Sequence, residues 1–531
     1  MTTTTTPAAK SPSAYVETAV ANIPDIHASI VSTFRSHKTL PIDYRLDQLR
    51  KLYYAILDHK QALFDALFAD LHKPQTEAFF GDIAPTLADI VYVMENLKAW
   101  AKPQVQSSSV AVAAMNPTIR SDPLGTVLII SPFNYPILLS IGPLIGAIAA
   151  GNTAIVKASE LSRATTAVLA EIIGCLDPAA YRIIIGALPQ VLALQELKFD
   201  LIFYTGSGRV GRQVALNAAK TLTPVILELG GKCPAFLLDE SNFKVGVKRI
   251  LSGRFQGAGQ TCTSPDYVLL KRELADKFVA MTKEVLNEFF PVMNENTEFT
   301  HLVNDAAFER VYRLIQNTRG TIIAGGADDC VRAAKFIPPT VIMDVKPDDS
   351  SMAEEIFGPV LPVMLIDTVD EGIDYVNTYH DTPLALYVFS KDSTTQQYVL
   401  NCTRSGGVMI NSTVIHVGVP YVPFGGVGES GMGSYHGKFS FDAFSHKRAV
   451  LSQPAWTDFF TSFRYPPATS FKMRLIDQAT PWAAYFPRTG SIPSTFVGKL
   501  MFRLGKVKFS ALVATTAALV LTVFGNKVKR R

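Results

Sequence analysis

Short runs of β-branched residues alternate with apolar helical segments between Gly125 and Asp239. Each run is nearly continuous in apolar residues, which is typical of parallel strands that are covered on both faces. Strands that alternate with helices in this way predict an α/β domain built on a parallel sheet. The predicted strands are residues 126–131, 153–156, 182–185, 201–204, 225–227 and 235–238.

The chain before this region has a helical pattern. Between Ile42 and Leu71, leucine and isoleucine recur at helical spacing, which predicts one long amphipathic helix with its apolar stripe in a core. The segment from Pro136 to Ala150 is also apolar, but it is short and contains Gly142 and Pro143. It therefore predicts a buried helix and not a membrane span.

A second α/β lobe is predicted after Asp239. Residues 244–259 and 272–290 have helical patterns, and strand-like runs at 360–365 and 384–389 enclose another helix. The length of 531 residues agrees with two or three lobes, because one domain usually holds roughly 100–200 residues.

Charge and cysteine content exclude several classes of protein. The chain has 50 Lys and Arg against 46 Asp and Glu, a formal charge of +4, so a nucleic-acid partner is not expected. Its five cysteines are far apart and form no CxxC pair, so neither a disulfide framework nor a metal site is indicated. We therefore expect a reducing compartment and no bound metal.

The two ends differ from the middle of the chain. Residues 1–20 begin with a Thr-rich stretch without an apolar signal segment, which predicts a disordered lead-in. Residues 509–525 contain no charged side chain and lie between clusters of Lys and Arg. A buried helix is the alternative, but the basic flanks at the end of the chain favour a single C-terminal membrane anchor.

A GxGxxG string at 206–211 follows the predicted strand 201–204 and opens a helix. The dinucleotide-binding fingerprint normally lies in the first strand–helix turn of its sheet, whereas several predicted strands precede this one. We therefore interpret Gly206 as part of a cofactor phosphate site at a helix N-terminus. We do not interpret Glu228, which lies further on, as a ligand of the ribose.

Seven motifs together resemble those of the aldehyde dehydrogenase superfamily, in order and in spacing. They are PFNYP at 132–136, KASE at 157–160, FYTGS at 203–207, ELGGK at 228–232, GQTC at 259–262, EEIFGP at 354–359 and PFGGVG at 423–428. The string GMGSYHGK at 431–438 resembles the class 3 branch, which contains membrane-anchored fatty aldehyde dehydrogenases. Ala158, Cys233 and Ser412 depart from the family pattern and leave the catalytic set intact.

The resemblance implies that Cys262 is the nucleophile, since a thiolate attacks a carbonyl carbon and leaves readily from a thioester. Asn134 would donate to the oxyanion, although it could equally serve as a turn residue. Glu228 would be the general base that activates water to hydrolyse the thioester. The other four cysteines are interpreted as apolar filler.

The resemblance also implies a bound NAD. It places Lys157 and Glu160 at the adenosine ribose, and Gly206 and Ser207 at the pyrophosphate. Glu355 and Phe357 would surround the nicotinamide ribose. The carboxylate of Glu160 favours NAD because it repels a 2′-phosphate, although class 3 members often tolerate NADP.

The predicted fold is therefore aldehyde dehydrogenase-like, with a Rossmann-type parallel-sheet cofactor domain, a second α/β catalytic domain, an oligomerisation arm and a transmembrane helix. The expected parts are a disordered lead-in (1–20), an NAD(P)-binding domain (21–239) that includes part of an oligomerisation arm (107–119), a catalytic domain (240–430), an oligomerisation and membrane-proximal segment (431–508), and the anchor (509–525).

A long-chain apolar aldehyde is the expected substrate, since a membrane address suits an aldehyde that dissolves in lipid. Apocarotenoid aldehydes such as beta-apo-4'-carotenal are the alternative, followed by aromatic aldehydes. We expect a homodimer that is tail-anchored in the mitochondrial outer membrane, peroxisome or endoplasmic reticulum, with the catalytic body in the cytosol. A CoA-acylating enzyme would not need Glu228, and a non-catalytic relative would lack one of Cys262, Asn134 and Glu228.

Overall fold

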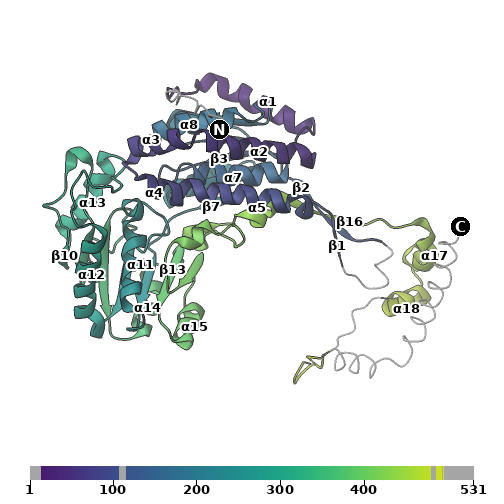
Figure 1. Ribbon diagram of the computed structural model, residues 1–531. Helices are drawn as coiled ribbons and strands as arrows, with labels where there is room; N and C mark the ends of the chain where they lie inside the picture. The colour runs from purple at the N-terminus through teal and green to yellow at the C-terminus, as the bar shows by residue number, and fades with distance from the viewer. Residues whose placement is uncertain (1–13, 107–114, 480–485, 493, 496–531) are drawn as a thin grey trace, which may run out of the picture. The chain divides into compact units, whose positions relative to one another are not determined.

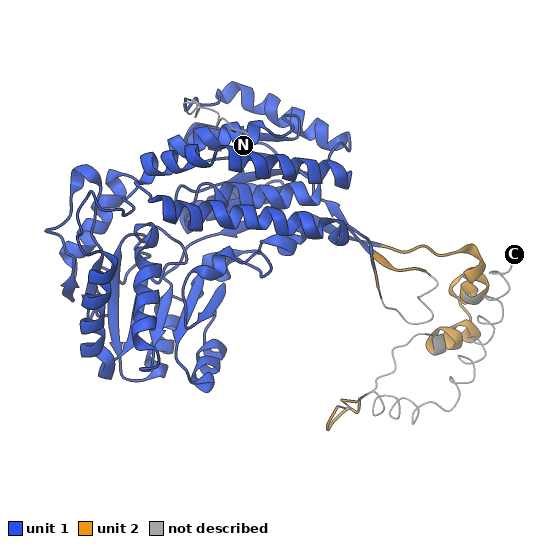
Figure 2. Cartoon of the chain, viewed as in Figure 1, with its two compact units in different colours: residues 1–104, 119–449 blue, residues 105–118, 450–531 orange. Residues whose placement is uncertain are grey.

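The computed structural model describes residues 14–106, 115–479, 486–492 and 494–495 (Figure 1). The chain divides into two compact units. The larger unit contains residues 1–104 and 119–449, and the smaller contains residues 105–118 and 450–531 (Figure 2).

The first sheet of the larger unit has six strands in the order β15-β7-β6-β3-β4-β5. Five of them are parallel, and β15 runs antiparallel to β7. The chain winds outward from β3 in both directions, as in doubly wound dinucleotide-binding sheets. The strands are Thr126–Ile130 (β3), Thr153–Lys157 (β4), Tyr181–Ile184 (β5), Leu201–Thr205 (β6), Val225–Glu228 (β7) and Gly431–Met432 (β15).

Helices cover both faces of this sheet, because its strands are apolar on both sides. One face packs against α1, α9 and α10 in a core that includes Leu128, Ile155 and Ile202. The other face packs against α2, α5, α7, α8 and α16. The helices are Ile23–Arg35 (α1), Ile42–Asp58 (α2), Lys60–Leu71 (α3), Gln75–Ala78 (α4), Ala84–Trp100 (α5), Leu138–Ala150 (α7), Arg163–Gly174 (α8), Leu188–Gln195 (α9), Gly208–Ala219 (α10) and Gly437–Ala443 (α16).

Two sequence predictions in this region have different outcomes. The buried helix is confirmed as α7, in which every residue is buried. The single long helix is wrong: the segment from Ile42 to Leu71 forms α2 and α3, which are separated at His59. The backbone of His59 has φ −98° and ψ 9°, outside the helical range, so the apolar spacing continues while the helix axis is interrupted.

The second sheet has seven strands in the order β10-β11-β12-β9-β8-β13-β14, all parallel except β10. The predicted second α/β lobe is therefore confirmed. Its strands are Pro234–Leu237 (β8), Tyr267–Lys271 (β9), Thr321–Ala324 (β10), Thr340–Met343 (β11), Val360–Ile366 (β12), Ala385–Phe389 (β13) and Gly407–Ile410 (β14). Its helices are Phe243–Phe255 (α11), Ala275–Phe289 (α12), Asp305–Asn317 (α13), Val369–Tyr379 (α14) and Ser393–Cys402 (α15).

Strand β8 lies in the second sheet, between β9 and β13, whereas the sequence analysis counted it with the first. The chain crosses from one sheet to the other between Glu228 and Pro234, through Gly230 and Gly231. Gly231 has φ +156°, a conformation that side chains disfavour. The ELGGK motif is therefore the connection between the two lobes.

The remaining elements are few. A three-stranded sheet has the order β1-β2-β16, formed by Gln104–Val105 (β1), Thr118–Pro123 (β2) and Ser445–Val450 (β16). The smaller unit contains Asp458–Thr461 (α17) and Ser470–Ala479 (α18). Within the described part of the chain, no helix is both long and apolar enough to span a membrane. The predicted anchor at 509–525 lies outside the described residues.

Candidate active site

The candidate site lies at the carboxyl ends of β3, β6 and β7. Strands β3 and β6 are neighbours, and the chain leaves them toward opposite edges of the sheet. Loops after such a pair form a crevice, which is where open α/β sheets bind ligands. Asn134 is in the loop after β3, Gly206 and Ser207 follow β6, and Glu228 ends β7.

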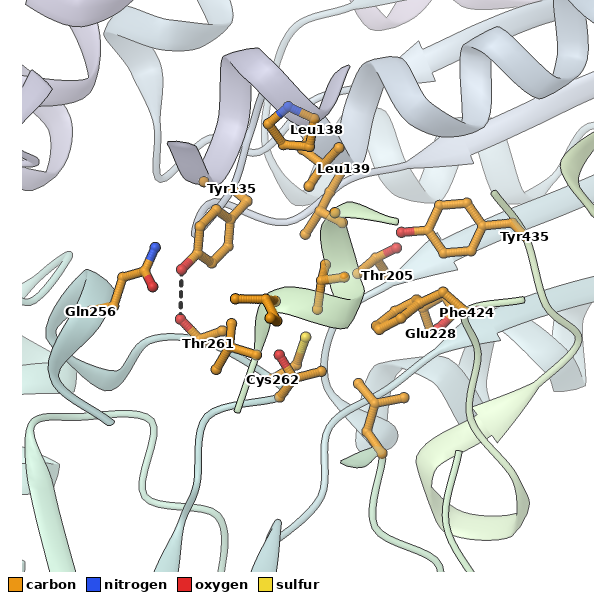
Figure 3. A pocket seen from close by; sticks show the side chains of 18 of the residues that line it. Tyr135, Leu138, Leu139, Thr205, Glu228, Gln256, Thr261, Cys262, Phe424 and Tyr435 are labelled. Carbon is orange, nitrogen blue, oxygen red and sulfur yellow. Dashed lines mark hydrogen bonds between the residues drawn. The ribbon is translucent and has the colours of Figure 1, made fainter. Parts of the chain in front are cut away.

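A cavity of about 400 Å³ contains both Cys262 and Glu228 in its wall (Figure 3). This volume is within the range of small-molecule sites. Most of its wall is apolar, and the loop after β3, the end of α11 and the segment 414–418 all contribute to it. The lining residues are Phe80, Gly81, Pro85, Tyr135, Leu138, Leu139, Thr205, Glu228, Leu229, Gln256, Thr261, Cys262, Thr263, Leu384, Val414, Ile415, Val417, Gly418, Phe424 and Tyr435.

Cys262 is held by the tight turn that precedes it. Gly259 has φ +69°, and a Cβ atom there would lie 2.2 Å from the carbonyl oxygen of Gly358, so only glycine fits. The side chain of Gln260 donates to the carbonyl of His301 at 3.0 Å and accepts from the N–H of Val303 at 3.0 Å. Thr261 shares a 2.8 Å hydrogen bond with Tyr135. The backbone that carries the thiol of Cys262 is therefore fixed in position.

Burial, followed by the nearby carboxyl groups of Glu355 and Glu228, raises the pKa of the Cys262 thiol to about 12. Loss of water disfavours the thiolate, and so does a negative charge nearby. The thiol is therefore protonated at neutral pH in the protein alone. A group that stabilises negative charge at this position would activate it.

Glu228 is the last residue of β7 and is 2% exposed. Neither of its carboxylate oxygens has a hydrogen-bond partner among the described residues. Burial raises the pKa of this carboxyl group well above its usual value. A carboxyl group with a raised pKa, in the same cavity as a thiol, is suited to accept a proton from water.

Asn134 is connected to the backbone next to Cys262. Its side-chain amide donates to the backbone carbonyl of Gln260 at 2.8 Å, and its backbone carbonyl accepts from the buried ammonium of Lys73 at 2.8 Å. The amide has a second N–H, which this bond leaves available for an oxyanion. Asn134 is not itself among the residues that line the cavity.

The predicted cofactor residues fit a dinucleotide. Helix α10 begins at Gly208 with Ser207 as its N-cap and has no acidic residue in its first turn, so its N–H groups can bind phosphate. Gly206 has φ +159°, and a Cβ atom there would lie 2.4 Å from the hydroxyl oxygen of Tyr204. A side chain at position 206 would therefore collide with the ring of Tyr204.

The two predicted ribose sites are each built around a carboxylate. Lys157 is 2% exposed and donates to the carbonyl of Ala158 at 2.6 Å, with Glu160 at 3.4 Å. Burial lowers the pKa of Lys157. Glu355 lies against Gly230, where a Cβ atom would be 2.2 Å from its carboxylate oxygen. The rings of Phe357 and Phe133 are 6.0 Å apart, which brings this loop beside the loop after β3.

A buried charge cluster holds the Glu355 loop in place. Asp266 pairs with Lys232 at 2.6 Å and with Arg254 at 2.7 Å, and accepts from the N–H of Ile356 at 3.2 Å. Sequence reasoning missed these residues, as well as Thr205, Tyr135 and Tyr435 in the cavity wall. Several of them lie within the motifs, but no local sequence pattern indicates where the folded chain places their side chains.

The geometry can be compared with known proteins. The model of the aldehyde dehydrogenase family matches residues 2–450. The chain belongs to this family. Membership makes it an NAD(P)-dependent aldehyde dehydrogenase, as the motif resemblance predicted.

Three relatives place this aldehyde dehydrogenase near the class 3 branch. The beta-apo-4'-carotenal oxygenase of Neurospora crassa is 40% identical over 88% of this chain and 88% of its own. The fatty aldehyde dehydrogenase of Saccharomyces cerevisiae is 39% identical over 86% and 88%. Aldehyde dehydrogenase family 3 member H1 of Arabidopsis thaliana is 40% identical over 84% and 92%. The predicted class 3 resemblance is confirmed.

A solved structure shares the fold over most of the chain. The substrate-bound AldH of Staphylococcus aureus is 36% identical, with a TM-score of 0.83, and the match covers 86% of this chain and 98% of that chain. The two parallel-sheet lobes of the aldehyde dehydrogenase fold are therefore confirmed.

Proposed function

We propose that this enzyme oxidises long-chain apolar aldehydes, such as fatty aldehydes, to carboxylic acids through a thiohemiacetal and a thioester on Cys262. The observation that carries the proposal is the mostly apolar cavity that holds Cys262 and Glu228 in its wall. An aliphatic chain that enters it leaves water, at about 0.8 kcal/mol per buried CH₂. Small aldehydes gain little from this burial.

In the first half of the reaction, the sulfur of Cys262 attacks the carbonyl carbon as a thiolate. The second amide N–H of Asn134 and the backbone N–H of Cys262 would stabilise the oxygen that becomes negative. NAD(P) would supply the acceptor for the hydride that leaves this carbon. Lys157, Glu160, Gly206, Ser207, Glu355 and Phe357 would hold it, and Glu160 favours NAD over NADP by repelling a 2′-phosphate.

In the second half, Glu228 accepts a proton from the water that hydrolyses the thioester. Its raised pKa makes it a stronger base than an exposed carboxylate. This role distinguishes the proposal from a CoA-acylating enzyme of the same fold, in which CoA would take the acyl group. The name of the Neurospora crassa relative supports apocarotenoid aldehydes as the second substrate class, and aromatic aldehydes are a third.

We also propose a membrane address and a dimer. Residues 509–525 would form a membrane anchor, with the catalytic domains in the cytosol at the mitochondrial outer membrane, peroxisome or endoplasmic reticulum. Residues 107–119 and the stretch after Lys447 would form the arms of a homodimer. The proposed domain ranges are 21–239, 240–430 and 431–508, except that β8 at the end of the first range belongs to the sheet of the second.

The substrate proposal is tested by comparing kcat/KM for acetaldehyde, hexadecanal and a long apocarotenal, with and without residues 509–531. We expect the full chain and the chain without residues 509–531 to prefer hexadecanal, since the cavity lies within the larger unit. A preference for the apocarotenal would favour the second substrate class. A preference for acetaldehyde would contradict the proposal.

A further inference from the structure

Four residues in the cavity wall carry buried side-chain oxygens that have no hydrogen-bond partner among the described residues: Thr205, Glu228, Thr263 and Tyr435. Tyr435 is 1% exposed and Thr205 is 8% exposed. Buried polar groups in folded proteins almost always have partners, so several exceptions in one cavity require an explanation. These side chains can bind a polar molecule that enters the cavity.

Thr205 is beside Glu228 because of the strand register. Thr205 ends β6 and Glu228 ends β7, and the two residues are partners in the parallel pair. Partners in neighbouring strands are about 4.8 Å apart and project from the same face of the sheet. The hydroxyl of Thr205 and the carboxyl group of Glu228 therefore face the cavity together.

Tyr435 reaches the same place from a distant part of the sequence. Strand β15 pairs with β7 so that Gly431 is opposite Glu228, and the chain then continues to Tyr435. Two backbone hydrogen bonds with Phe424, of 2.8 and 3.1 Å, hold Tyr435, and its ring packs edge-on against Phe203 at 5.0 Å. In Figure 3 its hydroxyl points into the cavity.

The charge of Glu228 contributes to the raised pKa of the Tyr435 hydroxyl, after burial. This effect places the two groups within electrostatic range of each other. It also keeps Tyr435 protonated, so that its hydroxyl remains a hydrogen-bond donor at any pH at which the enzyme works. Tyr435 cannot compete with Glu228 as the base.

We propose that Tyr435 and Thr205 are positioning residues that hold the hydrolytic water beside Glu228. This inference rests on the proposed role of Glu228 as the general base. A water molecule in a buried site needs two to four polar partners, and the two hydroxyls with the carboxylate supply three. Thr263 follows Cys262 directly and is not needed for this arrangement.

The step that these residues serve can be written with its atoms balanced. The water oxygen forms a bond to the thioester carbon while the carboxylate of Glu228 takes one of its protons. The carbon–sulfur bond then breaks, and its electron pair leaves on Cys262 as a thiolate. The second proton of the water stays on the acid product, which ionises on release. The two hydroxyls hold the water beside the carboxylate of Glu228, so that a lone pair of the water oxygen faces the thioester carbon.

The test uses Tyr435→Phe and Thr205→Val in the full chain, each mixed rapidly with NAD and hexadecanal. We expect each variant to keep a burst of about one NADH per site, because acylation does not use the water. The steady-state rate should fall about tenfold to a hundredfold, as for a small misplacement of a reacting group. Intact-protein mass spectrometry should show acyl-Cys262 accumulating during the slow phase.

Tyr181→Phe is the matched control, since Tyr181 is also buried and its hydroxyl has no hydrogen-bond partner among the described residues, but it lies on β5 at the opposite edge of the sheet. We expect this control to match the wild type in both phases. A burst that falls together with the steady-state rate in both test variants would indicate a structural role and overturn the inference.

Glu228→Gln, measured in parallel, separates the inference from the function on which it rests. If Glu228→Gln gives a burst and then stalls while both hydroxyl variants turn over like the wild type, the positioning role is wrong and the role of Glu228 stands. If Glu228→Gln gives no burst, the role of Glu228 fails, and the positioning role fails with it.

Discussion

At the scale of single residues, the surroundings of Cys262 oppose its ionisation. Burial dominates, and the carboxyl group of Glu355 is the next contribution to a thiol pKa of about 12. Burial also raises the pKa of Glu355 to about 8. A cysteine that must become a thiolate is thus surrounded by groups that disfavour negative charge in the protein alone. Activation of the nucleophile therefore depends on what binds beside it.

Replacement of Cys262 by Ser tests the nucleophile itself. We expect Cys262→Ser to lose aldehyde oxidation, because the hydroxyl of serine is a far poorer nucleophile and leaving group at this position. Binding of NAD, measured by fluorescence titration, should be unchanged, since only the covalent step is removed. Activity close to that of the wild type would mean that another group attacks the aldehyde.

Glu355→Gln should make the thiol easier to ionise. Above pH 8, where Glu355 is ionised, the substitution removes a negative charge that raises the pKa of Cys262. Each unit by which a thiol pKa falls gives about ten times more thiolate. We therefore expect several-fold faster alkylation of Cys262 by iodoacetamide at pH 9 in the enzyme without cofactor.

Glu354→Gln is the control for this experiment. Glu354 is next in sequence, but its side chain is 63% exposed. Alkylation should keep its wild-type rate and pH dependence in this variant. If the rate in Glu355→Gln also stays at the wild-type value, the charge of Glu355 does not control the thiol.

The sequence predicts some of these residues and cannot predict others. Cys262 and Glu228 stand in short motifs whose glycines indicate close backbone approaches, and the structure places both residues in one cavity. Tyr435 stands in a motif that resembles class 3, yet its place beside Glu228 depends on the pairing of β15 with β7. Such a contact between distant segments has no local pattern.

At the scale of elements, one buried ion pair ties the start of the larger unit to the loop after β3. Lys73 and Asp82 are 1% and 0% exposed, and their charged atoms are 3.0 Å apart. Lys73 also donates to the carbonyl of Asn134, and Asp82 accepts from the N–H of Leu138. The pair therefore holds both ends of the segment that carries Asn134.

Removal of Asp82 should destabilise the fold. Asp82→Ala leaves the ammonium of Lys73 buried without its carboxylate, which typically costs about 3–5 kcal/mol in the free energy of unfolding. Urea unfolding followed by fluorescence would measure the loss. The variant should also have a lower kcat, because Asn134 loses its support.

Asp47→Ala provides the comparison on the surface. Asp47 pairs with Lys51 at 2.9 Å on α2, and both side chains are at least one-third exposed. An exposed pair of this kind contributes at most about 1 kcal/mol. An equal loss of stability in Asp82→Ala and Asp47→Ala would show that the buried pair is not a main support of the fold.

The sequence predicted the positions of the strands better than it predicted which sheet each strand joins. The five parallel strands of the first sheet are largely apolar, so their pattern revealed them, with ends that differ by at most one residue, whereas the short strand β15 was not predicted. The assignment of β8 to the second sheet could not be predicted in the same way, since its apolar pattern would suit either sheet. The break at His59 was missed because the apolar stripe continues across it.

At the scale of the whole molecule, the proposals concern assembly and membrane attachment. A chain that lacks residues 509–531 should sediment as a homodimer, because the proposed arms lie before the anchor. The full chain should pellet with membranes and be released by detergent but not by high salt, since burial of an apolar segment is insensitive to ionic strength. A truncated chain that sediments as a monomer would contradict the dimer. A full chain that remains in the supernatant would contradict the anchor.

The most direct test of the whole account is the time course of NADH formation by Glu228→Gln with hexadecanal. The account predicts a rapid burst of about one NADH per site, because Cys262 still forms the thioester, followed by a steady state far slower than that of the wild type, as expected when a general base is lost. A burst and a steady state that fall by the same factor would contradict it, since Glu228 would then act before the thioester forms or only in folding.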